Sequence, residues 1–180
     1  MFDVDDSADA GDTRQLVRAE LDRVRRTFAR RVSEMTPADL SRSTNGTDWT
    51  NRELLFHMLF GYLVVRRLLP LVKALGHLPP HRSKPFAALL DASTRPFNFI
   101  NYLGSVGGGR ALTPKRMLRW LNSTTAKIER DMDRQDEASL RRGMHFPTRW
   151  DPYFKDFMTL ADTYHYPTQH FDHHDRQLNL

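Results

Sequence analysis

One apolar helix limits the fold of this chain more than any other segment. Thr50 is typical of a helix N-cap, and Glu53, three residues later, completes a capping box in which side chains and backbone bond reciprocally. From Leu54 to Leu69 nearly every residue is apolar, so this helix must be covered on most of its sides. Pro70 is expected to kink or end the helix. The chain therefore needs further helices packed around a buried one.

Two other segments carry apolar residues at steps of three and four, the period of a helix with one buried face. The first is expected to run from Asp12 or Thr13 to about Met35, and the other opens at the N-cap and N1 pair Thr113-Pro114. Their apolar stripes are Val17, Leu21, Val24, Phe28 and Val32 in the first, and Leu118, Leu121, Thr125, Ile128 and Met132 in the second. Each of these helices can cover one side of the apolar helix.

A fourth helix is expected to open at Asp151-Pro152, with Pro167 kinking or restarting it. Between the second and third helices lies an unusually long connection, His77–Leu112, with short helices expected at 86–91 and 97–103. Its glycine-rich stretch Gly104–Gly109 is interpreted as a flexible connection. Strand signals are nearly absent. The sequence thus predicts an all-α fold, a four-helix bundle with a long connection between helices 2 and 3.

Charge divides the chain into two expected parts. Residues 1–12 carry five aspartates and no base, which predicts an acidic, disordered tail before a bundle domain at 13–180. The net charge of +5 therefore leaves 27 − 17 = +10 on the remainder, mostly as arginine dispersed along helices. We expect this charge to form solvated helix faces and predict no nucleic-acid partner, because no recognition helix, finger or stacking platform accompanies it.

The N-terminus lacks the apolar stretch of a signal peptide, and the best membrane candidate, 54–72, is interrupted by His57, Arg66, Arg67 and Pro70. We therefore expect a cytoplasmic protein with no membrane contact. The sequence also contains eight histidines and no cysteine. This excludes a disulfide scaffold, cysteine-held zinc and a thiol nucleophile of the chain's own, so a bound metal would be held by nitrogen and oxygen.

Three histidines form the strongest candidate for chemistry. His170 and His174 are four residues apart, which places both on one helix face, about 6 Å from each other, on the side of Phe171 and Leu178. His57 lies within the apolar helix, where a buried imidazole needs partners. Three neutral imidazoles around a divalent ion leave open positions for water or substrate, as in catalytic zinc sites.

Other interpretations stay open on the residues alone. His57 can be a core histidine with ordinary hydrogen bonds, and a histidine-rich helix end can be simply solvated. His165 and His173 are candidates for an additional ligand, or for residues that hydrogen-bond to the ligands and orient them. A fourth protein ligand would favour a structural ion over a catalytic one.

The histidines lie in two motifs that resemble a known family. Residues 49–58 read Trp-Thr-Asn-Arg-Glu-Leu-Leu-Phe-His-Met, similar to the W-[ST]-x-x-E-L-L-x-H helix of the DinB-like superfamily, and 170–178 resemble its closing H-x-x-H-H-x-x-Q-[LI] signature. The resemblance implies a four-helix bundle that binds a divalent metal, most often zinc or nickel, through His57, His170 and His174. Pro167 and the extra His165 depart from the plain pattern.

Related bundles include mycothiol-dependent maleylpyruvate isomerases, thiol S-transferases and metal-dependent hydrolases. Our first hypothesis is a metal-dependent enzyme that uses its ion to activate a low-molecular-weight thiol or water against a small-molecule substrate. A thiol would have to be a cosubstrate, because the sequence has no cysteine. The alternative is a non-enzymatic metal-binding or stress-response module with a structural ion. A homodimer is a further expectation, since an apolar bundle face can support one.

Overall fold

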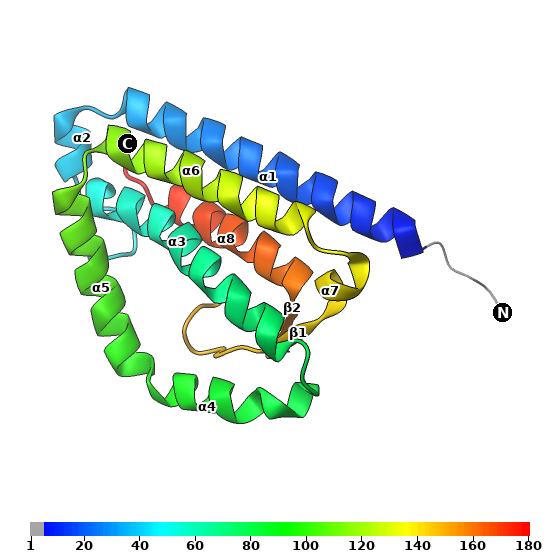
Figure 1. Ribbon diagram of the computed structural model, residues 1–180. Coiled ribbons are helices and arrows are strands. Elements are labelled where there is room, and N and C mark those ends of the chain that lie inside the picture. The colour runs from blue at the N-terminus through cyan, green and yellow to red at the C-terminus, as the bar shows by residue number, and fades with distance from the viewer. Residues whose placement is uncertain (1–5) are drawn as a thin grey trace.

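Four long helices form the body of the molecule in the computed structural model, which describes residues 6–180 (Figure 1). These helices are α1 (Asp6–Glu34), α3 (Asn51–Leu75), α6 (Pro114–Asp133) and α8 (Leu160–Asp175). Helix α3 packs against α6 and α8, and α1 covers the same two helices from the other side. The predicted all-α fold is confirmed. Helix α1 begins at Asp6, earlier than expected. Residues 1–5 of the predicted acidic tail lie outside the described residues. The division of the chain at residue 12 stays a prediction.

The remaining elements are short or lie outside the bundle. They are α2 (Pro37–Ser41), η1 (Pro80–Arg82), α4 (Lys84–Ala92), α5 (Thr94–Ala111), α7 (Glu137–Arg141), β1 (Gly143–His145) and β2 (Phe157–Thr159). The two strands form an antiparallel pair in which Met144 lies opposite Met158. The sequence did not predict this pair, because three residues are too few to show alternation.

Helix α3 is the buried helix at the centre. Its N-terminus carries the predicted capping box of Thr50 and Glu53. Pro70 does not end the helix, which continues to Leu75, because the apolar residues after the proline, Val72 above all, are still packed in the core. Among the described residues, α3 alone is long and apolar enough to cross a membrane, but half of its most apolar window is buried against its neighbours. Such burial is typical of the core helix of a bundle.

The long connection is mostly helical. Helices α4 and α5 run from the C-terminal end of α3 back to its N-terminal end, where α5 packs against it (Figure 1). The prediction of a flexible stretch at Gly104–Gly109 is therefore wrong. A Cβ atom at Gly108 would overlap the Phe56 ring, and one at Gly109 would lie 2.8 Å from the Glu53 Cα atom. The glycines let two helices approach closely, and this packing outweighs their low helix propensity.

The last helix also begins elsewhere than expected. Helix α8 starts at Leu160, where Thr159 and Asp162 form a capping box, and Asp151-Pro152 lies in the loop before it. The Asp-Pro pair and the Thr-x-x-Asp pattern are both helix-start signals, and the structure uses the second. Pro167 lies inside one continuous helix and does not restart it.

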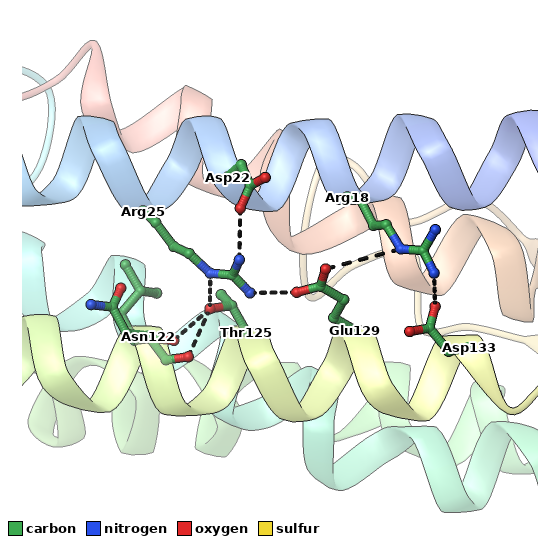
Figure 2. A network of polar contacts seen from close by, with 8 residues as sticks. Arg18, Asp22, Arg25, Asn122, Thr125, Glu129 and Asp133 are labelled. Carbon is green, nitrogen blue, oxygen red and sulfur yellow. Dashed lines mark hydrogen bonds and ion pairs between the residues drawn. The ribbon is translucent and has the colours of Figure 1, made fainter.

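Four arginines of α1, Arg18, Arg23, Arg25 and Arg31, form ion pairs with acids on other helices. Arg25 contacts Glu129 at 2.7 Å and donates to the Thr125 hydroxyl, and Arg18 contacts Asp133 at 2.6 Å (Figure 2). Exposed pairs of this kind each contribute at most about 1 kcal/mol. Their main effect here is to neutralise part of the dispersed positive charge locally and to hold α1 in register on α6.

Candidate metal centre

The structure brings the three predicted histidines together between α3 and α8. His57 lies in the second turn of α3, and His170 and His174 lie one turn apart on α8. All three are buried, with 4%, 7% and 9% of their surface exposed. One ring nitrogen from each forms a group within 4.8 Å, and the Nε2 atoms of His57 and His174 are 3.1 Å apart.

Each ring has a hydrogen-bond acceptor on its far side. The Nδ1 atom of His57 lies 3.1 Å from the Ser105 hydroxyl, which itself donates to the Asn101 carbonyl and so accepts from the ring. The Nδ1 atom of His170 lies 2.9 Å from an Asp151 carboxylate oxygen, and that of His174 lies 2.6 Å from the Gln177 amide oxygen. These acceptors assign the proton to Nδ1 in every ring, which leaves each Nε2 lone pair directed at the shared centre.

The centre itself lacks a donor for these lone pairs. The Nε2 atom of His170 is buried with no hydrogen-bond partner among the described residues. Burial, together with the neighbouring His170 and His174, lowers the pKa of His57, and burial is also the main cause that lowers the pKa of His174 to about 3. The His57 and His174 rings are therefore neutral at pH 7. Three converging imidazoles with oriented outer hydrogen bonds fit a divalent transition metal.

Sequence reasoning missed Asp151. Its Oδ2 atom accepts from the Tyr166 hydroxyl and from His170, while Oδ1 accepts from the Tyr153 backbone N–H. Burial raises the pKa of Asp151, but the hydrogen bonds that its carboxylate accepts from His170, the Tyr153 backbone and Tyr166 outweigh it, so the pKa lies below its usual value. The sequence placed Asp151 at a helix start, and nothing local to it indicates a contact with a residue nineteen positions later.

Gly61 is a second residue that shapes the site. The space left by its missing side chain is taken by His170, whose Cδ2 atom would lie 2.9 Å from a Cβ atom at position 61. Of the outer partners, Ser105 sits in the stretch taken for a flexible loop, whereas Gln177 belongs to the closing motif. Ser105 could not be identified from the sequence, because the neighbouring glycines predicted a loop, and a residue in a loop has no defined face.

His165 and His173, the candidates for an additional ligand, lie within hydrogen-bonding distance of other side chains. His165 turns towards α1, where its Nδ1 atom lies 3.0 Å from a Glu20 carboxylate oxygen. His173 lies at the edge of the site with Nδ1 3.2 Å from the Tyr153 hydroxyl. Neither belongs to the three-histidine group.

A cavity of about 220 Å³ opens over the histidines. His57, His170 and His174 form part of its lining, together with apolar side chains of α3 and α5 and the loop that precedes α8. Tyr166 also lines this cavity, whereas Tyr62 is buried in the core and bonds to Thr168. The cavity therefore has room beside the histidines for a molecule larger than water.

Comparison with known proteins gives one family. A family model described as the DinB superfamily matches residues 20–178, which include all three histidines and Asp151. The searches of curated proteins and of solved structures found no match.

Proposed function

Since the chain belongs to the DinB superfamily, we propose that it binds a divalent metal ion, zinc or nickel, through the Nε2 atoms of His57, His170 and His174. One observation carries the proposal: all three Nδ1 atoms face acceptors, so three lone pairs converge on a buried point where His170 has no partner. A cation is the species that satisfies such a cluster.

We propose further that the protein is an enzyme rather than a metal-stabilised module. An ion held by three imidazoles can lower the pKa of a bound water or hold a thiolate. The residues of this chain would hold that ion, exclude bulk water and orient a small electrophile in the cavity. A thiol reactant would be a low-molecular-weight cosubstrate, because the sequence contains no cysteine.

The surroundings of the cluster favour this view over a structural ion. A structural site is closed by a fourth protein ligand. The two side chains nearest to that role, His165 and His173, are hydrogen-bonded to Glu20 and Tyr153. The cavity beside the cluster leaves room for a bound molecule in place of a fourth protein ligand.

A small molecule is also a better partner than a nucleic acid. Arg18 and Arg25 are paired with acids on α6, and Arg23 and Arg31 are paired with Asp172 and Asp175 on α8. Paired arginines offer little net charge to a phosphate backbone, whose binding depends on free cations. A cytoplasmic location remains part of the proposal.

Elemental analysis after purification without chelators tests the metal proposal. Wild-type protein is expected to hold about one divalent ion per chain, a stoichiometry typical of such a site, and His57→Ala and His174→Ala are expected to lose it. His165→Ala is the matched control, because it lies on the same helix with its ring turned to Glu20, and it should keep the ion. Full metal retention in both ligand variants would refute the assignment.

A further inference from the structure

Aromatic side chains make up much of the wall of the cavity above the histidines. They come from separate parts of the chain and include Trp49, Phe60, Phe97, Trp150, Phe154 and Tyr166. Aromatic side chains from several parts of the chain favour contact with a flat apolar molecule.

Part of this wall is fixed in place. The rings of Phe97 and Trp150 are stacked, with centroids 3.9 Å apart and planes 8° from parallel. The indole N–H of Trp150 donates to the Leu90 carbonyl at 2.7 Å, which ties the loop before α8 to α4. Because this surface is preformed, ordering it on ligand binding costs little free energy.

The wall carries no positive side chain. Among the described residues that line the cavity there is neither lysine nor arginine, and the acid among them is Asp151. The Asp151 carboxylate already accepts three hydrogen bonds, from Tyr153, Tyr166 and His170. An anionic group placed against this wall would lose its water, gain no lysine or arginine partner and lie near a carboxylate, all of which oppose binding.

The size of the cavity limits the ligand as well. An engineered apolar cavity of about 150 Å³ in another protein holds one benzene molecule. The present cavity, at about 220 Å³, has room for one ring with a short substituent. Its few polar groups, among them Asn101 and His173 at the edge, can orient such a ligand but do not change the apolar character of the wall.

We propose that this cavity selects small substrates or cosubstrates with a neutral, flat, ring-shaped body, and that any anionic atom of the ligand is the one that reaches the three histidines. The proposal deepens the proposed function and rests on it for the reactive end of the ligand. The preference for a neutral ring rests on the wall alone. Thiols or electrophiles that carry a carboxylate on their body are expected to be poor ligands.

Titration of the zinc-loaded full-length protein with four probes tests the proposal. Benzyl mercaptan, 2-mercaptoethanol and 3-mercaptopropionate share a thiol but differ in their bodies, and benzyl alcohol has the ring without the thiol. The readout is the NMR signal of each indole N–H. Trp49 and Trp150 line the cavity, whereas Trp120 lines a different surface hollow and serves as the internal control.

We expect benzyl mercaptan to bind at least about tenfold more tightly than 2-mercaptoethanol, a gain of about 1.4 kcal/mol from the ring, with 3-mercaptopropionate the weakest thiol. The signals of Trp49 and Trp150 should shift while Trp120 stays in place. Equal affinities for the three thiols, or a shift confined to Trp120, would overturn the proposal.

Removal of zinc separates this proposal from the metal assignment. If benzyl mercaptan and benzyl alcohol bind equally well with and without zinc, the ring preference stands and the proposal that the ion holds the thiol fails. If all thiols need zinc but bind alike, the metal assignment stands and the ring preference fails.

A charge placed in the wall gives a second test. Val64→Lys puts an ammonium group on a residue that lines both the cavity and the hollow of Trp120. Leu63→Lys changes the adjacent residue, which lines that hollow but not the cavity. Affinity for 3-mercaptopropionate should rise at least about tenfold in the first variant only. An unchanged affinity in Val64→Lys would contradict the argument from charge.

Discussion

Outer hydrogen bonds decide which nitrogen of each histidine is free at the centre of this protein. Ser105, Asp151 and Gln177 each accept from an Nδ1 atom, and only the Asp151 carboxylate is charged. An ionised acceptor gives a stronger bond and makes the imidazole a better ligand. Asp151 is therefore the outer partner whose loss should matter most.

Asp151→Asn removes this charge while keeping the size of the side chain. Zinc affinity should fall by about 10- to 100-fold, the range typical of such outer partners. Tyr166→Phe, which removes another bond to the same carboxylate oxygen, should have a smaller effect. Competition with a metallochromic chelator measures both. Equal zinc affinity in Asp151→Asn and wild type would show that Asp151 does not position His170.

Gly61 offers an independent test of the same ligand. In Gly61→Ala the new methyl group would lie 2.9 Å from His170 Cδ2, so the ring must move and zinc affinity should fall. Gly104→Ala is the matched control in another helix, because nothing lies within 4 Å of its added methyl group. The control should bind zinc normally and gain up to about 1 kcal/mol of stability from better helix propensity. Titration calorimetry with zinc distinguishes the two outcomes.

At the level of elements, α5 depends on close contact with α3. Gly108→Ala would drive a methyl group into the Phe56 ring and should lower the free energy of unfolding by about 1–3 kcal/mol. Gly107→Ala, one position earlier with no neighbour within 4 Å, should be neutral or stabilising. Urea denaturation of the two variants measures the difference. Similar stabilities would mean that α5 does not pack as described.

The starts of α3 and α6 could be predicted from local chemistry, but the start of α8 could not, because two local signals compete for it, and neither could helix α5, which depends on tertiary contact. Thr50 with Glu53 specifies the start of α3 from within four residues. Helix α5 is held by a neighbour about fifty residues away in the chain, so its glycines looked like a loop. The same limit applies to the site: the i, i+4 spacing predicted two ligands, whereas Asp151 reaches His170 only through the folded loop.

At the level of the whole molecule, the site joins the first and second halves of the chain. His57 comes from α3, His170 and His174 from α8, and the cavity wall from α5 and the loop before α8. An ion bound here would link these elements only in the folded state. Metal binding should therefore stabilise the entire bundle by mass action.

Zinc should raise the melting temperature of the wild-type protein. A free zinc concentration of 100 Kd adds about 2.7 kcal/mol, because the ion binds the folded state alone. For a chain of this size that corresponds to a rise of about 5–10 °C. His170→Ala should show no such rise. Differential scanning calorimetry with and without zinc measures it, and an equal rise in the variant would place the stabilising ion elsewhere.

Crystallography of the zinc-loaded protein with anomalous data at the zinc edge is the most direct test of the central claim. We predict one strong anomalous peak between α3 and α8, about 2.0–2.1 Å from the Nε2 atoms of three histidines, namely His57, His170 and His174. A peak elsewhere, or an ion bound through Nδ1 of any of these rings, would contradict the account.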